Sequence, residues 1–261
     1  MDFKDRPIGF FDSGVGGISV LKQAVRILPK ENFVYFGDSL RAPYGIRTSS
    51  EVEKLTFDAV KFLLEKNIKA LVIACNTATS VSIEDLRRKY GGSMPVIGIE
   101  PALKPAVQYG RDGKVVIMAT PVTLAENKFD NLMKKYDLNN NVESMPCPGL
   151  VELIESGIIR GERVEMYLKE KFLPLKDDKI AAVVLGCTHY PFIKEALNKI
   201  LNEMNKDVVI IDGSIGTVNQ LKRQLLKHNM MSSAHRAGRV EMFNSLNTHE
   251  IIELSYKLLN T

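Results

Sequence analysis

Two cysteines in matching settings carry the strongest chemical signal in this sequence. The apolar run LVIA precedes Cys75, and the run VVLG precedes Cys187. Asn-Thr follows the first cysteine and Thr-His follows the second, so each cysteine is predicted to lie between the carboxyl end of a strand and the start of a helix. A thiol at a helix N-terminus has a lowered pKa, which suits a base or a nucleophile. His189 could tune the Cys187 thiol.

Two other interpretations of these cysteines need no catalysis. A buried cysteine often serves only as a small hydrophobic residue. Cys75, Cys187 and His189 could also bind zinc, but the sequence has no fourth ligand at local spacing. We therefore expect no metal site.

A glycine-rich turn, FFDSGVGG at residues 10–17, follows the first predicted strand. Glycines let backbone amides approach a ligand, and the helix N-terminus that follows favours an anion. A dinucleotide fingerprint would need glycine where Ser19 stands, and the Walker pattern is absent. Asp12 lies where open α/β sheets bind ligands, although it could simply cap the turn.

Polar residues follow two further strand ends. Tyr44, in the loop DSLRAPYG, is interpreted either as a lid residue or as a packed aromatic side chain. Thr120 and Thr123 could cap a helix that starts at Pro121 or donate hydrogen bonds to a carboxylate.

Cys147 and Glu152 lie close together in the segment MPCPGLVELIE. Cys147 stands between two prolines without a paired motif, and we interpret it as structural. Glu152 opens a predicted helix, where its carboxylate would favour the positive helix end. The alternative is that Glu152 faces the second thiol.

The elements that must position these residues alternate between strands and helices. Amphipathic spacing predicts helices at 18–28, 50–66 and 192–205, the second capped by Ser49 or Ser50. This alternation predicts an α/β fold with mainly parallel sheets. Short apolar runs predict buried parallel strands at 8–11, 33–37, 70–74, 96–99, 115–119, 181–185 and 208–211.

The repeated cysteine setting indicates a weak internal duplication. The two cysteines are about one small domain apart along the chain. We expect a first α/β domain at 1–98 plus 212–261 and a second at 99–211.

Composition excludes several other classes of protein. The 261 residues are 45% hydrophobic and 25% charged, which is ordinary for a globular chain and excludes a disordered one. The net charge of +4 is spread along the chain, and the densest basic cluster, at 222–239, is diluted by apolar residues, so we expect no nucleic-acid partner.

Targeting signals and cysteine usage bear on location. No apolar run is long enough to span a membrane, and the charged N-terminal segment does not fit a signal peptide. Three cysteines without a C-x-x-C motif argue against disulfides. We expect a cytoplasmic protein without a membrane partner.

Together these segments resemble the glutamate racemases of the aspartate/glutamate racemase family. The resemblance covers nearly the whole chain, and the pairing of ACNTA with GCTHYP is specific. The matching segments are IGFFDSGVGG at 8–17, YFGD at 35–38, PYG at 43–45, ACNTAT at 74–79, PGLVE at 148–152, LGCTHYP at 185–191 and DGS at 212–214.

The resemblance implies a fold and an activity. Two pseudo-symmetric α/β domains, each a mainly parallel sheet flanked by helices, would enclose an active site in the cleft between them. The implied reaction interconverts L- and D-glutamate without pyridoxal phosphate, metal or any other cofactor, and the D-isomer supplies peptidoglycan synthesis. Family members are often homodimers.

The resemblance also implies residue roles. Cys75 and Cys187 would be the two acid–base residues, one on each face of the α-carbon, acting on D- and L-glutamate respectively. Asp12 would assist the first thiol, and His189 and Glu152 the second. The implied substrate contacts are Asp12, Ser13, Tyr44, Gly45, Asn76, Thr77, Thr120, Thr123, Thr188 and His189.

Two competing functions remain open at this level. Within the family, an aspartate racemase or a hydantoin- or maleate-type relative is the alternative, against which the DSGVGG and PYG segments favour glutamate. From another class, a non-catalytic protein could hold a carboxylate ligand at the glycine turn, with the thiols as mere core.

Overall fold

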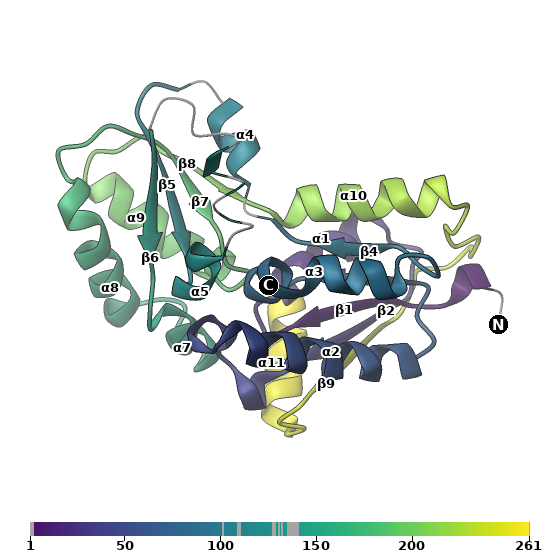
Figure 1. Ribbon diagram of the computed structural model, residues 1–261. Coiled ribbons are helices and arrows are strands. Elements are labelled where there is room, and N and C mark those ends of the chain that lie inside the picture. Colours follow the sequence, from purple (N-terminus) through teal and green to yellow (C-terminus); the bar gives the residue numbers. More distant parts are fainter. Residues whose placement is uncertain are drawn as a thin grey trace.

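Two parallel β-sheets, each flanked by helices, lie side by side (Figure 1). The structure is a computed structural model that describes residues 3–100, 102–108, 111–126, 129, 131, 133–134 and 141–260. The predicted α/β class with parallel sheets is confirmed. None of the described helices is long and apolar enough to cross a membrane.

The first sheet has five parallel strands in the order β4-β3-β1-β2-β9. The prediction located four of these strands and missed β9, which pairs with β2 at the edge of the sheet. The strands are β1 (Ile8–Asp12), β2 (Phe33–Gly37), β3 (Ala70–Ile73), β4 (Val96–Gly98) and β9 (Val240–Asn244).

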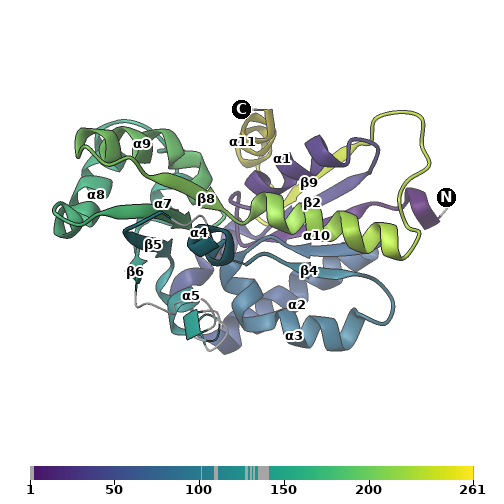
Figure 2. The ribbon, with the colours of Figure 1, turned by 90° about the horizontal axis from the view of Figure 1, so that it is seen from above.

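Helices cover both faces of this sheet (Figure 2). Successive side chains of a strand point to opposite faces, so Phe10 packs in the core beneath α1, α10 and α11, while Phe11 packs in the core beneath α2 and α3. These helices are α1 (Ile18–Ile27), α2 (Ser49–Glu65), α3 (Asn76–Tyr90), α10 (Ser214–Lys227) and α11 (His249–Asn260).

The start of α2 corrects a predicted cap. Thr48, not Ser49 or Ser50, is the N-cap residue. Its hydroxyl accepts a hydrogen bond from the Glu51 backbone N–H at 3.3 Å, and the Glu51 carboxylate accepts from the Thr48 N–H at 3.0 Å. This reciprocal capping box satisfies two backbone donors at once, which favours Thr48 over the serines that follow.

The second sheet has four parallel strands in the order β6-β5-β7-β8. The apolar runs predicted three of them and missed β6, an edge strand whose residues are mostly only half-buried or exposed. The strands are β5 (Lys114–Ala119), β6 (Val142–Pro146), β7 (Ile180–Leu185) and β8 (Val209–Asp212).

Longer helices cover one face of the second sheet and short ones the other. The residues that pack with α7, α8 and α9 form one core, and those near α4 form another. The described helices of this domain are α4 (Leu103–Gln108), α5 (Pro121–Ala125), α7 (Leu150–Glu155), α8 (Glu162–Phe172) and α9 (Lys194–Glu203).

The chain passes between the two sheets twice. It leaves the first sheet after β4 and returns after β8, and α10 then packs against α1. The two passages touch, because a Cβ added to Gly213 would collide with the carbonyl of Glu100. The domain boundaries expected at 98 and 212 stay a prediction.

A buried ion pair ties the starts of β2 and β3 together. Lys69 Nζ lies 2.5 Å from Glu31 Oε2, and both side chains are almost fully buried. Lys69 also donates to the carbonyl of Lys4, and Glu31 Oε1 accepts from the Ser232 N–H at 2.8 Å. The pair thereby joins the N-terminal segment to the chain that leads into β9.

We predict that Lys69→Met lowers the free energy of unfolding by about 3 kcal/mol, because it leaves the Glu31 carboxylate buried without its cation. Urea denaturation followed by circular dichroism measures this loss. Lys61→Met is the control, since Lys61 pairs with Asp58 on the exposed surface and should leave the midpoint unchanged. An unchanged midpoint for Lys69→Met would contradict the prediction.

Candidate active site

Cys75 caps the helix that follows β3. Its Sγ accepts a hydrogen bond from the Ala78 N–H at 3.4 Å and lies 3.5 Å from the hydroxyl of Ser13. The side chain is almost fully buried. The expected strand-to-helix setting is therefore confirmed for the first cysteine, and Ser13 joins it from the end of β1.

Asp12, at the carboxyl end of β1, is contacted from both domains. Its Oδ1 accepts the Gly14 N–H at 2.9 Å, which caps the glycine turn. Its Oδ2 accepts the Thr188 hydroxyl of the second domain, also at 2.9 Å. Asp12 is therefore both a turn cap and a link to the residues around the second cysteine.

Cys187 follows β7 and lies beside a histidine–carboxylate pair. Its Sγ is 3.6 Å from Nδ1 of His189, and Nε2 of His189 is 2.5 Å from Oε1 of Glu155. The same Glu155 oxygen accepts the Val15 N–H of the first domain at 2.8 Å. The second thiol thus belongs to a buried Cys–His–Glu chain that ends on the glycine turn.

The carboxylate of this chain is Glu155, so the expectation for Glu152 is wrong in position. Glu152 is exposed on α7. Leu150, Val151 and Ile154 form the buried face of this helix, and Glu155, one turn after Val151, lies at its edge. Helical spacing within the sequence LVELIE was the signal that would have favoured Glu155.

Burial sets the protonation of Cys75. Loss of solvent raises the pKa of the Cys75 thiol to about 12, and the neighbouring Asp12 charge adds to the rise. The contacts with Ser13 and the Ala78 N–H oppose it. Burial also raises the pKa of Asp12. Cys75 is accordingly a thiol at neutral pH.

The pair beside Cys187 favours charge separation. Burial lowers the pKa of His189, but hydrogen bonds to Cys187 and Glu155 and the Glu155 charge outweigh burial and raise it well above the usual value. Burial raises the pKa of Glu155, but the contacts with His189 outweigh it and lower the net value. An imidazolium held by a carboxylate therefore faces the second thiol.

Three threonine hydroxyls join the domains near the start of α3. Thr77 lies 3.0 Å from Thr120 and 3.1 Å from Thr123, and the last two are 2.9 Å apart. Thr120 also caps α5 as expected, since its hydroxyl accepts the Thr123 N–H at 3.3 Å. Gly45 lies directly against Thr120, where a Cβ would approach within 2.6 Å.

Asn76 and Tyr44 differ in what their polar atoms contact. Neither the oxygen nor the nitrogen of the buried Asn76 amide has a hydrogen-bond partner among the described residues. The Tyr44 hydroxyl donates to Asp38 at 2.6 Å and the ring is buried against Phe11. Asn76 is therefore available to a ligand, whereas the Tyr44 side chain is a packed aromatic.

Other features lie apart from this site. Cys147 is buried in the second core, with its Sγ 3.4 Å from the carbonyl of Met145. No three His, Cys, Asp or Glu residues in the described parts of the chain are grouped so as to hold a metal ion.

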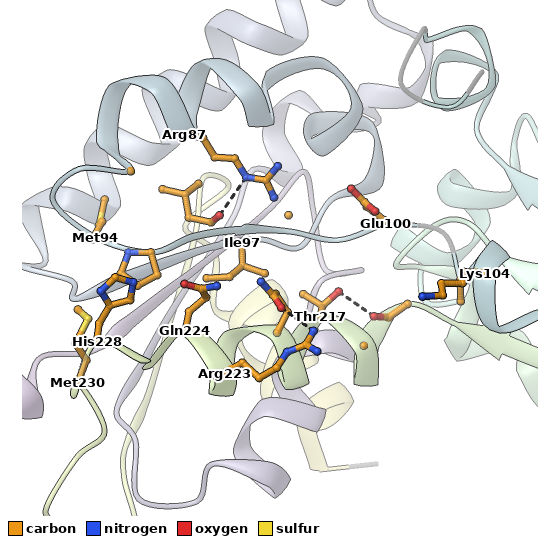
Figure 3. A pocket seen from close by; sticks show the side chains of 18 of the residues that line it. Arg87, Met94, Ile97, Glu100, Lys104, Thr217, Arg223, Gln224, His228 and Met230 are labelled. Carbon is orange, nitrogen blue, oxygen red and sulfur yellow. Dashed lines mark hydrogen bonds between the residues drawn. The ribbon is translucent and has the colours of Figure 1, made fainter. Parts of the chain in front are cut away.

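A cavity of about 800 Å³ lies between β4, the end of α3 and α10, near the two passages between domains (Figure 3). Arg87, Arg223 and His228 are among the residues around it, and Arg87 Nε donates to the carbonyl of Val96 at 3.4 Å. None of the predicted site residues is among the described residues that line it.

The sequence matches a known family over most of its length. The family model described as Asp/Glu/Hydantoin racemase matches residues 11–221. The chain belongs to this racemase family. The match runs from the glycine turn through both cysteines to α10.

Relatives of this racemase are similar over nearly their full length. A glutamate racemase of Clostridium kluyveri is 65% identical over 259 residues, covering 99% of both chains, and one of Clostridium novyi is 59% identical over 260 residues, also 99% of both.

Solved structures show the same fold. The glutamate racemase of Francisella tularensis in complex with D-glutamate has a TM-score of 0.84 at 32% identity, covering 99% of this chain and 95% of that one. The Escherichia coli enzyme in complex with L-glutamate and the activator UDP-MurNAc-Ala has a TM-score of 0.80 at 27% identity, with coverages of 97% and 95%.

We predict that Asp12→Asn lets Cys75 react at lower pH. Removing the carboxylate charge removes one cause of the raised pKa, so alkylation by iodoacetamide should begin at lower pH than in the wild type. Peptide mass spectrometry after alkylation across a pH series measures this for Cys75. An unchanged or higher midpoint would show that Asp12 does not act on this thiol.

We predict that Gly16→Ala reduces kcat/KM for racemisation by about 100-fold, because displacing reacting groups by about 1 Å has an effect of this order. The new Cβ would lie 2.6 Å from Cε1 of His189 and 2.7 Å from the Thr188 hydroxyl. Gly216→Ala, in α10 and with open space around it, is the matched control and should keep full activity. Equal activities in the two variants would refute the close fit at Gly16.

Proposed function

We propose that this racemase interconverts L- and D-glutamate by a two-thiol mechanism without a cofactor. The observation that carries the proposal is the meeting of Cys75 and Cys187, one from each domain, at a single buried site. The two are close enough for the charge of Cys187 to affect the pKa of Cys75. Relatives at 65% and 59% identity that are named glutamate racemases support the choice of substrate.

Inversion at the α-carbon needs a base on one face and an acid on the other. A single base would have to cross the plane of the substrate to return the proton to the opposite side. In our proposal Cys187 removes the α-proton of L-glutamate, and Cys75 delivers a proton from the opposite face. Cys75 removes the α-proton in the reverse direction.

The unequal surroundings of the thiols fit these roles. The raised pKa of Cys75 suits a proton donor. The His189 imidazolium, held by Glu155, suits a neighbour that stabilises a thiolate at Cys187. This distribution of protons is the one needed to start from L-glutamate.

The surrounding polar groups suit a small zwitterion. The Asn76 amide offers both a donor and an acceptor that the described protein does not use, which matches a ligand with a carboxylate and an ammonium group. The start of α3 favours a carboxylate, and Asp12 suits the ammonium. We propose that Ser13, Gly45, Thr77, Thr120, Thr123 and Thr188 complete the contacts.

The cellular role follows from the activity. We propose that the enzyme supplies D-glutamate for peptidoglycan synthesis, and hence for cell-wall formation and cell shape. We further propose that it acts in the cytoplasm as a homodimer and without nucleic acid. The resemblance to glutamate racemases, the spread of charge and the free cysteines support these parts of the proposal.

We predict that the full-length chain, incubated with L-glutamate in D₂O and no cofactor, forms D-glutamate with deuterium at the α-carbon. Proton NMR follows loss of the α-proton signal, and a chiral assay follows the product. Cys75→Ala and Cys187→Ala should each abolish racemisation, since inversion needs both thiols. Cys147→Ala is the matched control and should remain active, because Cys147 lies in the second core.

Two results would contradict the proposal. Exchange with aspartate but not glutamate would assign another substrate within the family. No exchange with glutamate, aspartate or related acids would favour the binding-protein alternative.

A further inference from the structure

The carboxylate of Glu155 has a second set of contacts that the two-thiol mechanism does not use. Its Oε2 lies 3.3 Å from the hydroxyl of Ser39, in the short 3-10 helix Ser39–Arg41 after β2. The Ser39 hydroxyl in turn lies 2.9 Å from Nδ2 of Asn244, the last residue of β9. A hydrogen-bonded chain therefore runs from β9 of the first domain to Cys187 of the second.

The direction of this chain is fixed at its far end. The Leu246 N–H donates to Oδ1 of Asn244 at 3.0 Å, so the amide nitrogen is the atom that faces Ser39. An amide nitrogen can only donate, and a hydroxyl carries one proton. Ser39 therefore accepts from Asn244 and directs its own proton to Glu155.

Backbone contacts hold the two residues in place. Asn244 is almost fully buried and pairs with Gly37 in the β2–β9 ladder. The Ser245 N–H donates to the Gly37 carbonyl at 2.9 Å, and the Ser245 hydroxyl accepts the Leu40 N–H at 3.0 Å. The 3-10 turn that carries Ser39 is thus tied to the end of β9.

We propose that Ser39 and Asn244 are positioning residues that hold the Glu155 carboxylate charged and aligned on His189, and thereby set how readily Cys187 becomes a thiolate. The effect on the thiol follows from the contacts alone. The effect on racemisation rests in addition on the proposed function.

The sign of the effect follows from the contacts. A hydrogen bond donated to a carboxylate favours its charged form, and the Ser39 contact lowers the pKa of Glu155. Without that donor the pKa of Glu155 rises and His189 loses part of its charged partner. The pKa of His189 then falls, and Cys187 needs a higher pH to ionise.

Other titratable groups face this chain and stay unchanged in the variants. They belong to β1, β2, the start of α3, the segment after β6 and the 3-10 turn after Cys187. These groups are Asp12, Tyr35, Cys75, Cys147 and Tyr190.

We predict that Ser39→Ala moves the midpoint of Cys187 alkylation to higher pH by about half a unit or more. The full-length chain is treated with iodoacetamide across a pH series, and peptide mass spectrometry reports each cysteine separately. Cys75 serves as the internal reference and should keep its midpoint. Ser39→Thr retains the hydroxyl and should restore the wild-type value for Cys187.

Two further variants separate positioning from packing. Asn244→Asp reverses the chain, because Ser39 must then donate to the new carboxylate, and should shift Cys187 in the same direction as Ser39→Ala. Ser245→Ala removes a neighbouring hydroxyl that supports the same turn without touching Glu155, and should leave Cys187 unshifted.

Kinetics give an independent readout. The two enantiomers have equal free energies in water, so kcat/KM must fall equally in both directions for any variant. The informative quantity is the pH dependence of kcat/KM, whose acidic limb should move to higher pH in Ser39→Ala and return in Ser39→Thr.

Three outcomes would overturn the inference. They are an unshifted Cys187 in Ser39→Ala, equal shifts of Cys75 and Cys187, and an equal shift in Ser245→Ala. A shifted Cys187 in a chain that does not racemise glutamate would instead refute the proposed function and leave the positioning role standing.

Discussion

The close seating of the second domain against the glycine turn of the first is the constraint on which the rest of the structure depends. His189 and Glu155 lie so near this turn that a Cβ on Gly16 or Gly14 would collide with them. Thr188 reaches Asp12, and Glu155 reaches the Val15 N–H. These contacts exclude water, and the exclusion of water gives the buried charges their strength.

The same burial acts differently on the two thiols because their partners differ. Cys75 faces a carboxylate and a hydroxyl, so burial prevails and the proton stays on sulfur. Cys187 faces an imidazole whose other nitrogen is held by Glu155, so positive charge is available beside it. An internal repeat of strand, cysteine and helix has thus acquired two chemically distinct ends.

Sequence patterns predicted the parts of the fold that are buried on both faces. The seven apolar runs correspond to strands, whereas the edge strands β6 and β9 were missed because their side chains are only partly buried. Both cysteines and Asp12 were found because each ends an apolar run. Glu155 was misassigned to Glu152 by one helical turn, and the Ser39–Asn244 contact joins residues about 200 positions apart, which no local pattern encodes.

The contact between Gly213 and the Glu100 carbonyl determines how the molecule can open. Two adjacent attachments resist sliding of one domain over the other but permit rotation about their common line. A rotation wide enough to admit a substrate would separate Thr188 from Asp12, Glu155 from Val15 and Thr77 from Thr120 within one movement. Entry of the substrate and disassembly of the catalytic arrangement are therefore a single event, and the proton-transfer groups are aligned only once the substrate is enclosed.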